Sequence, residues 1–176
     1  VYIAMERLKG KDLRQRLADG WRPDPVQAAR IAKRVADALD YAHGCGVVHC
    51  DIKPANIFMT GRTQPKVLDF GIARVAQQGQ FDQVNIDLTA GASVPPPDLG
   101  SPYYVSPEHL RGDPLDARCD VYGVGVVLYE MLTGRRAIEG ETLEAIRTAV
   151  LEGEVVPAHR VNRAVNGALS AADRER

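Results

Sequence analysis

The feature of this sequence that most constrains its fold is the apolar run between Asp116 and Thr133. Its apolar residues surround the helical axis instead of forming one stripe, and a helix of this kind has to be buried by its neighbours. Gly134 follows at once, and glycine is a common residue just beyond a helix end. We therefore predict a central helix over 116–133. Its apolar positions are Val121, Val124, Val126, Val127, Leu128, Met131 and Leu132.

Four further segments have the spacing of amphipathic helices. The longest follows Asp24, which can cap a helix that has Pro25 in its first turn and apolar residues every three or four positions. Gly44 would end that helix. Asp12 can cap a shorter one that runs to Ala18. The remaining two helices are expected over 142–151 and 162–169.

Strands are expected to be few and short. Residues 57–59 and 66–68 are joined by a glycine-containing turn, a pattern that indicates a β-hairpin. Another strand is expected over 1–5, and a long loop over 77–97, where three prolines are consecutive. The predicted fold class is therefore α+β, mainly helical, with a small β-hairpin.

Composition narrows the class of protein further. The chain has 176 residues, a net charge of -1 and a hydrophobic fraction of 45%, which fit one globular domain. Because its positive and negative charges nearly balance, the chain gives no reason to expect nucleic acid or an acidic membrane as partner. No apolar run approaches the length of about 18 residues that is needed to span a membrane. The three cysteines lack metal-ligand spacing and are expected as reduced thiols in a cytoplasmic protein. Because the first residue is not Met and lies within a strand pattern, we expect a fragment of a longer protein.

Polar residues that suit phosphoryl transfer gather between His49 and Asn56. Asp51 and Lys53 lie on this connector, and closure of the hairpin can bring Asp69 beside Asn56. A carboxylate and an amide oxygen that face one point form a hard site suited to Mg²⁺. Lys53 adds a positive charge, and Asp51 could orient and deprotonate a hydroxyl group. Metal, cation and carboxylate together are the components of phosphoryl transfer.

Several short motifs occur in a fixed order: His49-Cys50-Asp51 with Lys53, Pro54 and Asn56, then Asp69-Phe70-Gly71, Ser106-Pro107-Glu108 and Asp120. These motifs resemble those in the C-terminal lobe of a protein kinase of the serine/threonine type, and their flanking residues are similar to those of bacterial members. The resemblance covers nearly all of the chain. It implies a partial catalytic domain over 1–176, with the hinge, the C-terminal lobe and an activation segment over 69–108, while the N-terminal lobe is absent.

The resemblance assigns a role to each matching residue. Asp51 would be the catalytic base, Lys53 would neutralise the γ-phosphate of ATP, and Asn56 and Asp69 would bind Mg²⁺. Substrates would be proteins with Ser or Thr hydroxyls, and neither nucleic acid nor a membrane is an expected partner of this segment. Further contacts with ATP would come from the backbone of Glu6 and Leu8, from Asp12 at the ribose, from Phe58 under the base, and from Met5 as gatekeeper.

Several matching residues have a structural alternative. Asp12 could act only as a helix cap, and Phe58 and Met5 could simply be core residues. The resemblance implies that His49 is a structural residue packed near Phe70 and that Asp120 braces the loop around Asp51, so neither is expected to be catalytic. Among the later positions, the resemblance places Ser101 in the substrate-binding loop and pairs Arg176 with Glu108.

The sequence also departs from the kinase pattern. Cys50 replaces an arginine that in many kinases binds a phosphorylated activation loop, so we expect activity that does not depend on this contact. We read Cys50 as a quiet substitution and not as a redox switch. No glycine-rich loop or strand lysine occurs, so the isolated chain is expected to bind ATP poorly and to be inactive. Two other classes stay open: a non-catalytic scaffold, and a small-molecule phosphotransferase acting on choline or an aminoglycoside.

Overall fold

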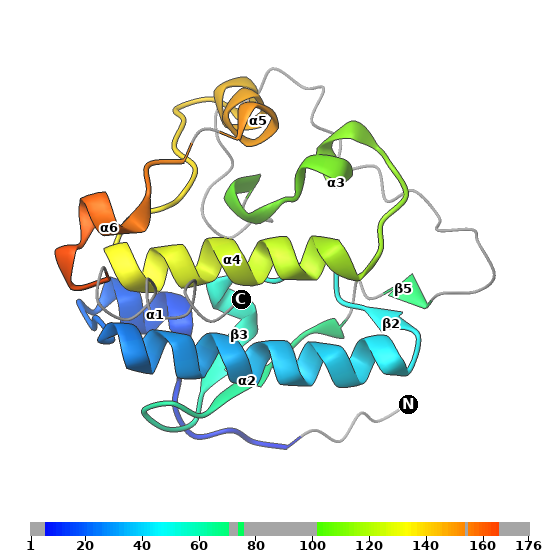
Figure 1. Cartoon of the computed structure of the whole chain (residues 1–176). Coiled ribbons are helices and arrows are strands. Elements are labelled where there is room, and N and C mark those ends of the chain that lie inside the picture. Colours follow the sequence, from blue (N-terminus) through cyan, green and yellow to red (C-terminus); the bar gives the residue numbers. More distant parts are fainter. Residues whose placement is uncertain (1–5, 71–73, 76–101, 154, 166–176) are drawn as a thin grey trace, which may run out of the picture.

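The computed structural model describes residues 6–70, 74–75, 102–153 and 155–165 (Figure 1). The strand expected over 1–5 and the loop expected over 77–97 lie outside these residues, as do Met5, Gly71, Ser101 and Arg176. The α-helices are α1 Leu13–Ala18, α2 Pro25–Gly44, α3 Pro107–Arg111, α4 Ala117–Thr133, α5 Leu143–Glu152 and α6 Ala158–Val161. The strands are β1 Lys11–Asp12, β2 Val47–Val48, β3 Ile57–Met59, β4 Pro65–Val67 and β5 Arg74–Val75, and short 3-10 helices are η1 Pro54–Asn56, η3 Pro102–Tyr104 and η4 Arg163–Val165.

Helix α4 is the central helix that its apolar pattern predicts. It begins after Asp116, whose carboxylate accepts the N–H of Arg118 at 2.9 Å, and it ends at Gly134, which has a left-handed backbone. Figure 1 shows α4 and α2 side by side, with α3 and α5 on the other side of α4. The helix is not enclosed along its whole length, because Val121 exposes 66% of its surface on a side that the described residues leave open.

The main core lies between α2, α4, α1 and the small sheet. Asp24 caps α2 as predicted, with its carboxylate accepting the N–H of Gln27 at 2.8 Å. The buried stripe of α2 then meets the inner side of α4, and burial of such apolar surface is the main source of stability. The buried members of this core include Leu13, Leu17, Ile31, Val35, Leu39, Ile52, Ile57, Met59, Val127, Met131 and Leu132.

The hairpin forms as predicted, and a third strand that was not predicted joins it. β3 and β4 are antiparallel, with Ile57 opposite Val67, and β1 pairs with the other edge of β3, placing Asp12 opposite Phe58. Gly10 makes this close approach possible, because a Cβ there would lie 2.1 Å from the carbonyl oxygen of Met59. A second, two-stranded sheet pairs β2 with β5.

The C-terminal part packs on the outer side of α4 through a second apolar cluster, formed by Tyr103, Ile138, Ile146 and Val150. Helix α5 matches the predicted segment and is capped by Thr142. The helix predicted over 162–169 is not an α-helix in its described part, where residues 163–165 form the 3-10 turn η4, and 166–169 lie outside the described residues. The short helix α6 ends before Asn162, whose side-chain amide donates to the carbonyl of Leu132 at 2.6 Å. Within the described residues, no helix has the length and apolar character needed to cross a membrane.

Candidate active site

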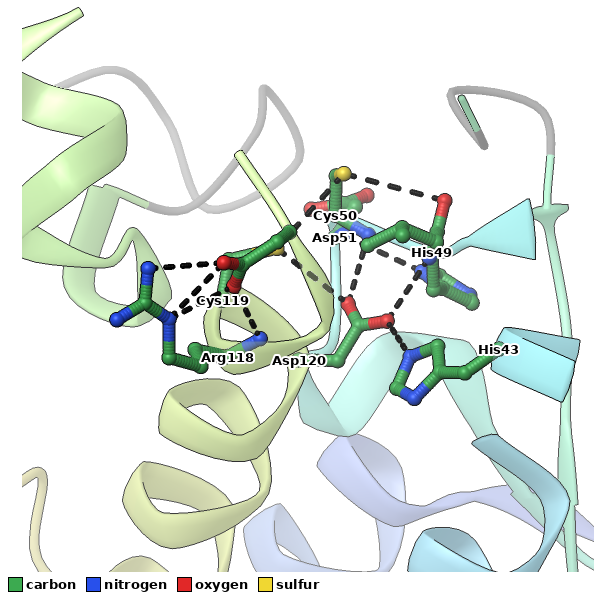
Figure 2. A network of polar contacts seen from close by, with 9 residues as sticks. His43, His49, Cys50, Asp51, Arg118, Cys119 and Asp120 are labelled. Atoms are coloured by element: carbon green, nitrogen blue, oxygen red, sulfur yellow. Dashed lines mark hydrogen bonds and ion pairs between the residues drawn. The ribbon is translucent and has the colours of Figure 1, made fainter. Parts of the chain in front are cut away.

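The site is organised by Asp120, a fully buried carboxylate in the first turn of α4. It accepts the backbone N–H of His49 at 2.9 Å and that of Cys50 at 2.7 Å (Figure 2). The side chain of His43, near the end of α2, contacts the same carboxylate through Nε2 at 2.8 Å. One carboxylate therefore joins α2, α4 and the segment between β2 and β3, which we call the 49–56 loop.

His49 is a structural residue of this loop, as expected. It is fully buried, its Nδ1 accepts the N–H of Asp51 at 3.2 Å, and its Nε2 lies 2.9 Å from the carbonyl oxygen of Leu68. Because Nδ1 accepts, Nε2 carries the hydrogen and donates it to Leu68. The ring of His49 also packs against Phe70 at 4.6 Å between ring centroids. These contacts connect the start of the 49–56 loop to the segment that follows β4.

Three predicted site residues meet at one oxygen atom. The Oδ2 of Asp51 accepts from Nζ of Lys53 at 2.7 Å and from Nδ2 of Asn56 at 2.9 Å. The same Nδ2 donates to the backbone carbonyl of Asp51 at 2.8 Å. Pro54 begins the 3-10 turn η1 and brings Asn56 back toward Asp51. The side chains of Asp51 and Lys53 stay partly exposed, at 25% and 17%, so a substrate can reach them.

Asp69 follows a residue that is bonded to both ends of the 49–56 loop. The N–H of Leu68 donates to the carbonyl of Asn56 at 2.8 Å, and the carbonyl of Leu68 accepts from His49. The structure thus places the backbone of Asp69 next to that of Asn56, as closure of the hairpin predicts. The shared approach of their side chains to one metal ion stays a prediction.

Backbone conformation singles out the same region. Among the described residues other than glycine, only Cys50 and Asp69 have a positive φ, at 62° and 58°. Such conformations are costly for residues with a Cβ, and they concentrate at functional sites that the surrounding contacts hold in place. At Cys50 the holding contact is the hydrogen bond from its N–H to Asp120.

Two of the residues expected to contact the nucleotide lie in the small sheet, Asp12 on its edge strand β1 and Phe58 on its central strand β3. Asp12 and Phe58 are opposite one another on β1 and β3. Asp12 also caps α1, because its carboxylate accepts the N–H of Gln15 at 2.7 Å. The cap does not exclude a contact with ribose, which stays a prediction. Glu6 is exposed and forms an ion pair with Lys66 at 2.6 Å, and Leu8 is half-buried.

Two neighbours of the site were missed from the sequence, His43 and Cys119. His43 lies six residues before the loop, and its only signal was its place near the end of α2. Cys119 precedes Asp120, and its Sγ lies 3.8 Å from that of Cys50. The hydrogen bond to Cys50 and burial raise the pKa of the Cys119 thiol well above its usual range.

The donor set of the site fits Mg²⁺. Asn56 uses its nitrogen on Asp51, which leaves its side-chain oxygen as a possible ligand, and Asp69 supplies a carboxylate on the adjacent segment. Hard oxygen donors, few in number, suit a cation that keeps several of its waters. In the part of the chain that the structure describes, no cluster of three or more His, Cys, Asp or Glu residues could hold another metal.

Comparison with known proteins agrees with this geometry. The model of the protein kinase domain matches residues 1–167. A probable serine/threonine-protein kinase of Corynebacterium efficiens is 42% identical over 156 residues, which cover 89% of this chain and 22% of that protein. Serine/threonine-protein kinase pkn3 of Myxococcus xanthus is 40% identical, and the match covers 91% of this chain and 29% of that protein. Serine/threonine-protein kinase PknB of Mycobacterium leprae is 36% identical, and the match covers 97% of this chain and 26% of that protein.

The chain therefore belongs to the protein kinase family, and to its eukaryotic-like serine/threonine type. It spans between a fifth and a third of the length of these relatives.

Proposed function

We propose that the protein containing this chain is an ATP-dependent serine/threonine protein kinase, and that this chain forms the C-terminal lobe of its catalytic domain. The observation that carries the proposal is the position of Asp51, whose Oδ2 accepts from both Lys53 and Asn56. These two bonds fix the carboxylate while leaving it accessible. A fixed and accessible carboxylate can orient an acceptor hydroxyl and take its proton during transfer.

The neighbouring residues supply the remaining parts of the reaction. Lys53, now paired with Asp51, can shift its charge toward the γ-phosphate when ATP binds. Asn56 and Asp69 would hold Mg²⁺, which neutralises charge on the phosphates when it is bound. Asp12 and Phe58 would face the ribose and the base, and the backbone of Glu6 and Leu8 would bond the adenine.

Two rival functions make different predictions. A scaffold without catalysis has no chemical need for Asp51, Lys53, Asn56 and Asp69 together. A small-molecule phosphotransferase would transfer phosphate to choline or an aminoglycoside instead of a protein. Both alternatives are less consistent with the chain, because the segment Ser106-Pro107-Glu108 and the pair Lys53-Pro54 are typical of protein kinases of the serine/threonine type.

The direct test incubates the full-length protein with Mg²⁺, radiolabelled ATP and either casein or myelin basic protein. We expect label on serine or threonine, and we expect Asp51→Asn to lower kcat by about 10²–10⁴-fold, the usual contribution of a positioned base. Asp37→Asn is the matched control, because Asp37 lies on the exposed side of α2, paired with Lys33, and should leave kcat unchanged.

The outcomes separate the candidate functions. Transfer to casein that Asp51→Asn does not reduce would refute the proposed role of Asp51. Transfer to choline or kanamycin with none to protein would favour the small-molecule enzyme, and no transfer to any acceptor would favour the scaffold. The isolated 176 residues are expected to give negligible transfer, because parts of the nucleotide cleft must come from residues outside this chain.

A further inference from the structure

Two cysteines that lie far apart in the sequence meet beside the active site. The Sγ atoms of Cys50 and Cys119 are 3.8 Å apart, although 69 positions separate these residues along the chain (Figure 2). Cys50 belongs to the 49–56 loop and is followed directly by Asp51. Cys119 belongs to the first turn of α4. The contact therefore joins the loop that carries the proposed base to the central helix.

The backbone holds the two thiols together. Asp120 follows Cys119 directly, and its carboxylate accepts the N–H of Cys50 at 2.7 Å. The left-handed backbone of Cys50, with φ of 62°, directs this amide toward α4. The Sγ–Sγ contact thus rests on a charged hydrogen bond between the neighbouring backbone positions, and not only on the rotamers of two side chains.

The surroundings give the two thiols different roles. Cys119 is 7% exposed and lies in an apolar cluster with Val48 and Leu115, and Cys50 packs against this cluster while remaining partly exposed. A dissolved oxidant therefore meets Cys50 first. The raised pKa keeps the thiol of Cys119 protonated at neutral pH, so it is not itself an early target for oxidation.

We propose that Cys50 and Cys119 form a reversible disulfide when the protein meets a hydroperoxide, and that this bond slows the kinase by displacing the 49–56 loop. The sequence alone favoured a quiet substitution at Cys50, and the position of Cys119 is what changes this interpretation. Disulfides in a reducing compartment are usually transient and sensory, which matches a pair placed beside a catalytic residue.

The chemistry balances in two steps. The sulfur of Cys50 attacks the outer oxygen of the hydroperoxide, the O–O bond breaks, and an alcohol or water leaves with the thiol proton, so that Cys50 becomes a sulfenic acid. The sulfur of Cys119 then attacks this sulfur, its thiol proton passes to the departing hydroxyl group, the S–O bond breaks, and water leaves as the S–S bond forms. Two electrons pass from the two sulfurs to the hydroperoxide, and a dithiol reductant such as dithiothreitol reverses the change.

The bond would change the geometry of the loop. A disulfide has an S–S length of about 2.05 Å, so the two sulfur atoms must approach by roughly 1.7 Å from their present separation. Cys119 is buried in α4, so most of this movement falls on Cys50, through rotation of its side chain and a shift of the 49–56 loop. Asp51 is the next residue, and a misplacement of about 1 Å at a reacting group can cost about 10²-fold in rate.

The test treats the full-length protein with hydrogen peroxide, blocks the remaining thiols with N-ethylmaleimide in denaturant, and maps peptides by mass spectrometry without reduction. We expect one peptide pair linked through Cys50 and Cys119, with Cys45 alkylated or separately oxidised. Cys45 is exposed at the end of α2, so Cys45→Ser is the matched control and should form the same link. Cys119→Ser and Cys119→Ala should both lose the link.

Activity is then measured on the same samples. This arm rests on the proposed function, and we expect the oxidised enzyme to lose at least about tenfold in kcat and dithiothreitol to restore it. Recovery of Cys50 and Cys119 as two separately alkylated thiols, under peroxide that fully modifies Cys45, would overturn the disulfide. A disulfide-linked protein that keeps full activity would refute the proposal that the disulfide regulates the kinase. A reduced protein without kinase activity would refute the proposed function, but it would not affect the evidence for the disulfide.

Discussion

Removal of the Asp120 carboxylate should be the most damaging single change outside the proposed catalytic residues. Asp120 is fully buried and accepts two backbone N–H groups of the 49–56 loop, at His49 and Cys50. The substitution Asp120→Ala leaves the buried N–H of His49 and the partly buried N–H of Cys50 without their partner. His43 is affected less, because its side chain is 19% exposed and its ring can turn toward solvent.

The magnitude follows from these two donors. An unsatisfied buried N–H costs about 1–3 kcal/mol, so the free energy of unfolding should fall by roughly 2–6 kcal/mol in Asp120→Ala. Asp120→Asn keeps one acceptor oxygen, so its free energy of unfolding should fall by about half as much as that of Asp120→Ala. Activity should fall as well, because the positive φ of Cys50 and the adjacent Asp51 depend on the same hydrogen bond.

Urea denaturation of the complete catalytic domain measures the effect, with Asp116→Ala as control. Asp116 lies one turn earlier, where it caps α4, a contribution of about 1 kcal/mol, and forms an exposed ion pair with Arg118 that adds little to stability. Asp120→Ala should lose the most free energy of unfolding, and Asp120→Asn and Asp116→Ala should lose smaller, similar amounts. If Asp120→Ala destabilises the domain no more than the exposed cap does, the reasoning that this carboxylate holds the 49–56 loop is wrong.

Two further predictions test how α4 meets its neighbours. Gly123→Ala should lower the free energy of unfolding by about 1–3 kcal/mol in thermal melts, because its Cβ would lie 2.8 Å from the Cβ of Ile52. Gly125→Ala is the control: its Cβ would meet nothing within 4 Å, so the substitution should be neutral or stabilising. Equal effects of the two substitutions would contradict this packing. Burial and Glu130 raise the pKa of the Tyr104 phenol. The unfolded chain therefore loses the phenol proton at a lower pH than the folded chain does. The free energy of unfolding should fall as pH rises above about 10, by at most about 1.4 kcal/mol per pH unit. Tyr104→Phe should remove this part of the alkaline slope in denaturation curves at pH 9–11, and an unchanged slope would mean that Tyr104 titrates normally.

Much of the fold could be predicted because its signals are local. The predicted caps Asp12 and Asp24 act on N–H groups three residues away, and the structure has both. The placement of Asp51, Lys53 and Asn56 on one connector was also predicted, and the contacts that the structure shows among them span at most five positions. Interactions of this range depend on the residues and on one turn of backbone, and a sequence pattern contains both.

Other features could not be predicted because they depend on where distant segments meet. The pairing of β1 with β3 joins Lys11 to Met59, and no local pattern marks a two-residue strand. The end of α6 at Asn162 depends on a bond to the carbonyl of Leu132 in a different helix. In both cases the energy that decides the structure comes from a partner that neighbouring sequence does not specify.

The amino-acid sequence alone determined the helical class, the central position of α4, and the order of polar residues that indicates phosphoryl transfer. The resemblance implied that Asp120 braces the 49–56 loop, but only the tertiary structure decided that it does so through the backbone N–H groups of His49 and Cys50. Only the tertiary structure decided that Cys119 comes to lie against Cys50. The physical reason is the range of the interactions. Turns and caps form between near neighbours, whereas a carboxylate or a thiol some 70 positions away reaches the loop only after α2 and α4 have packed together.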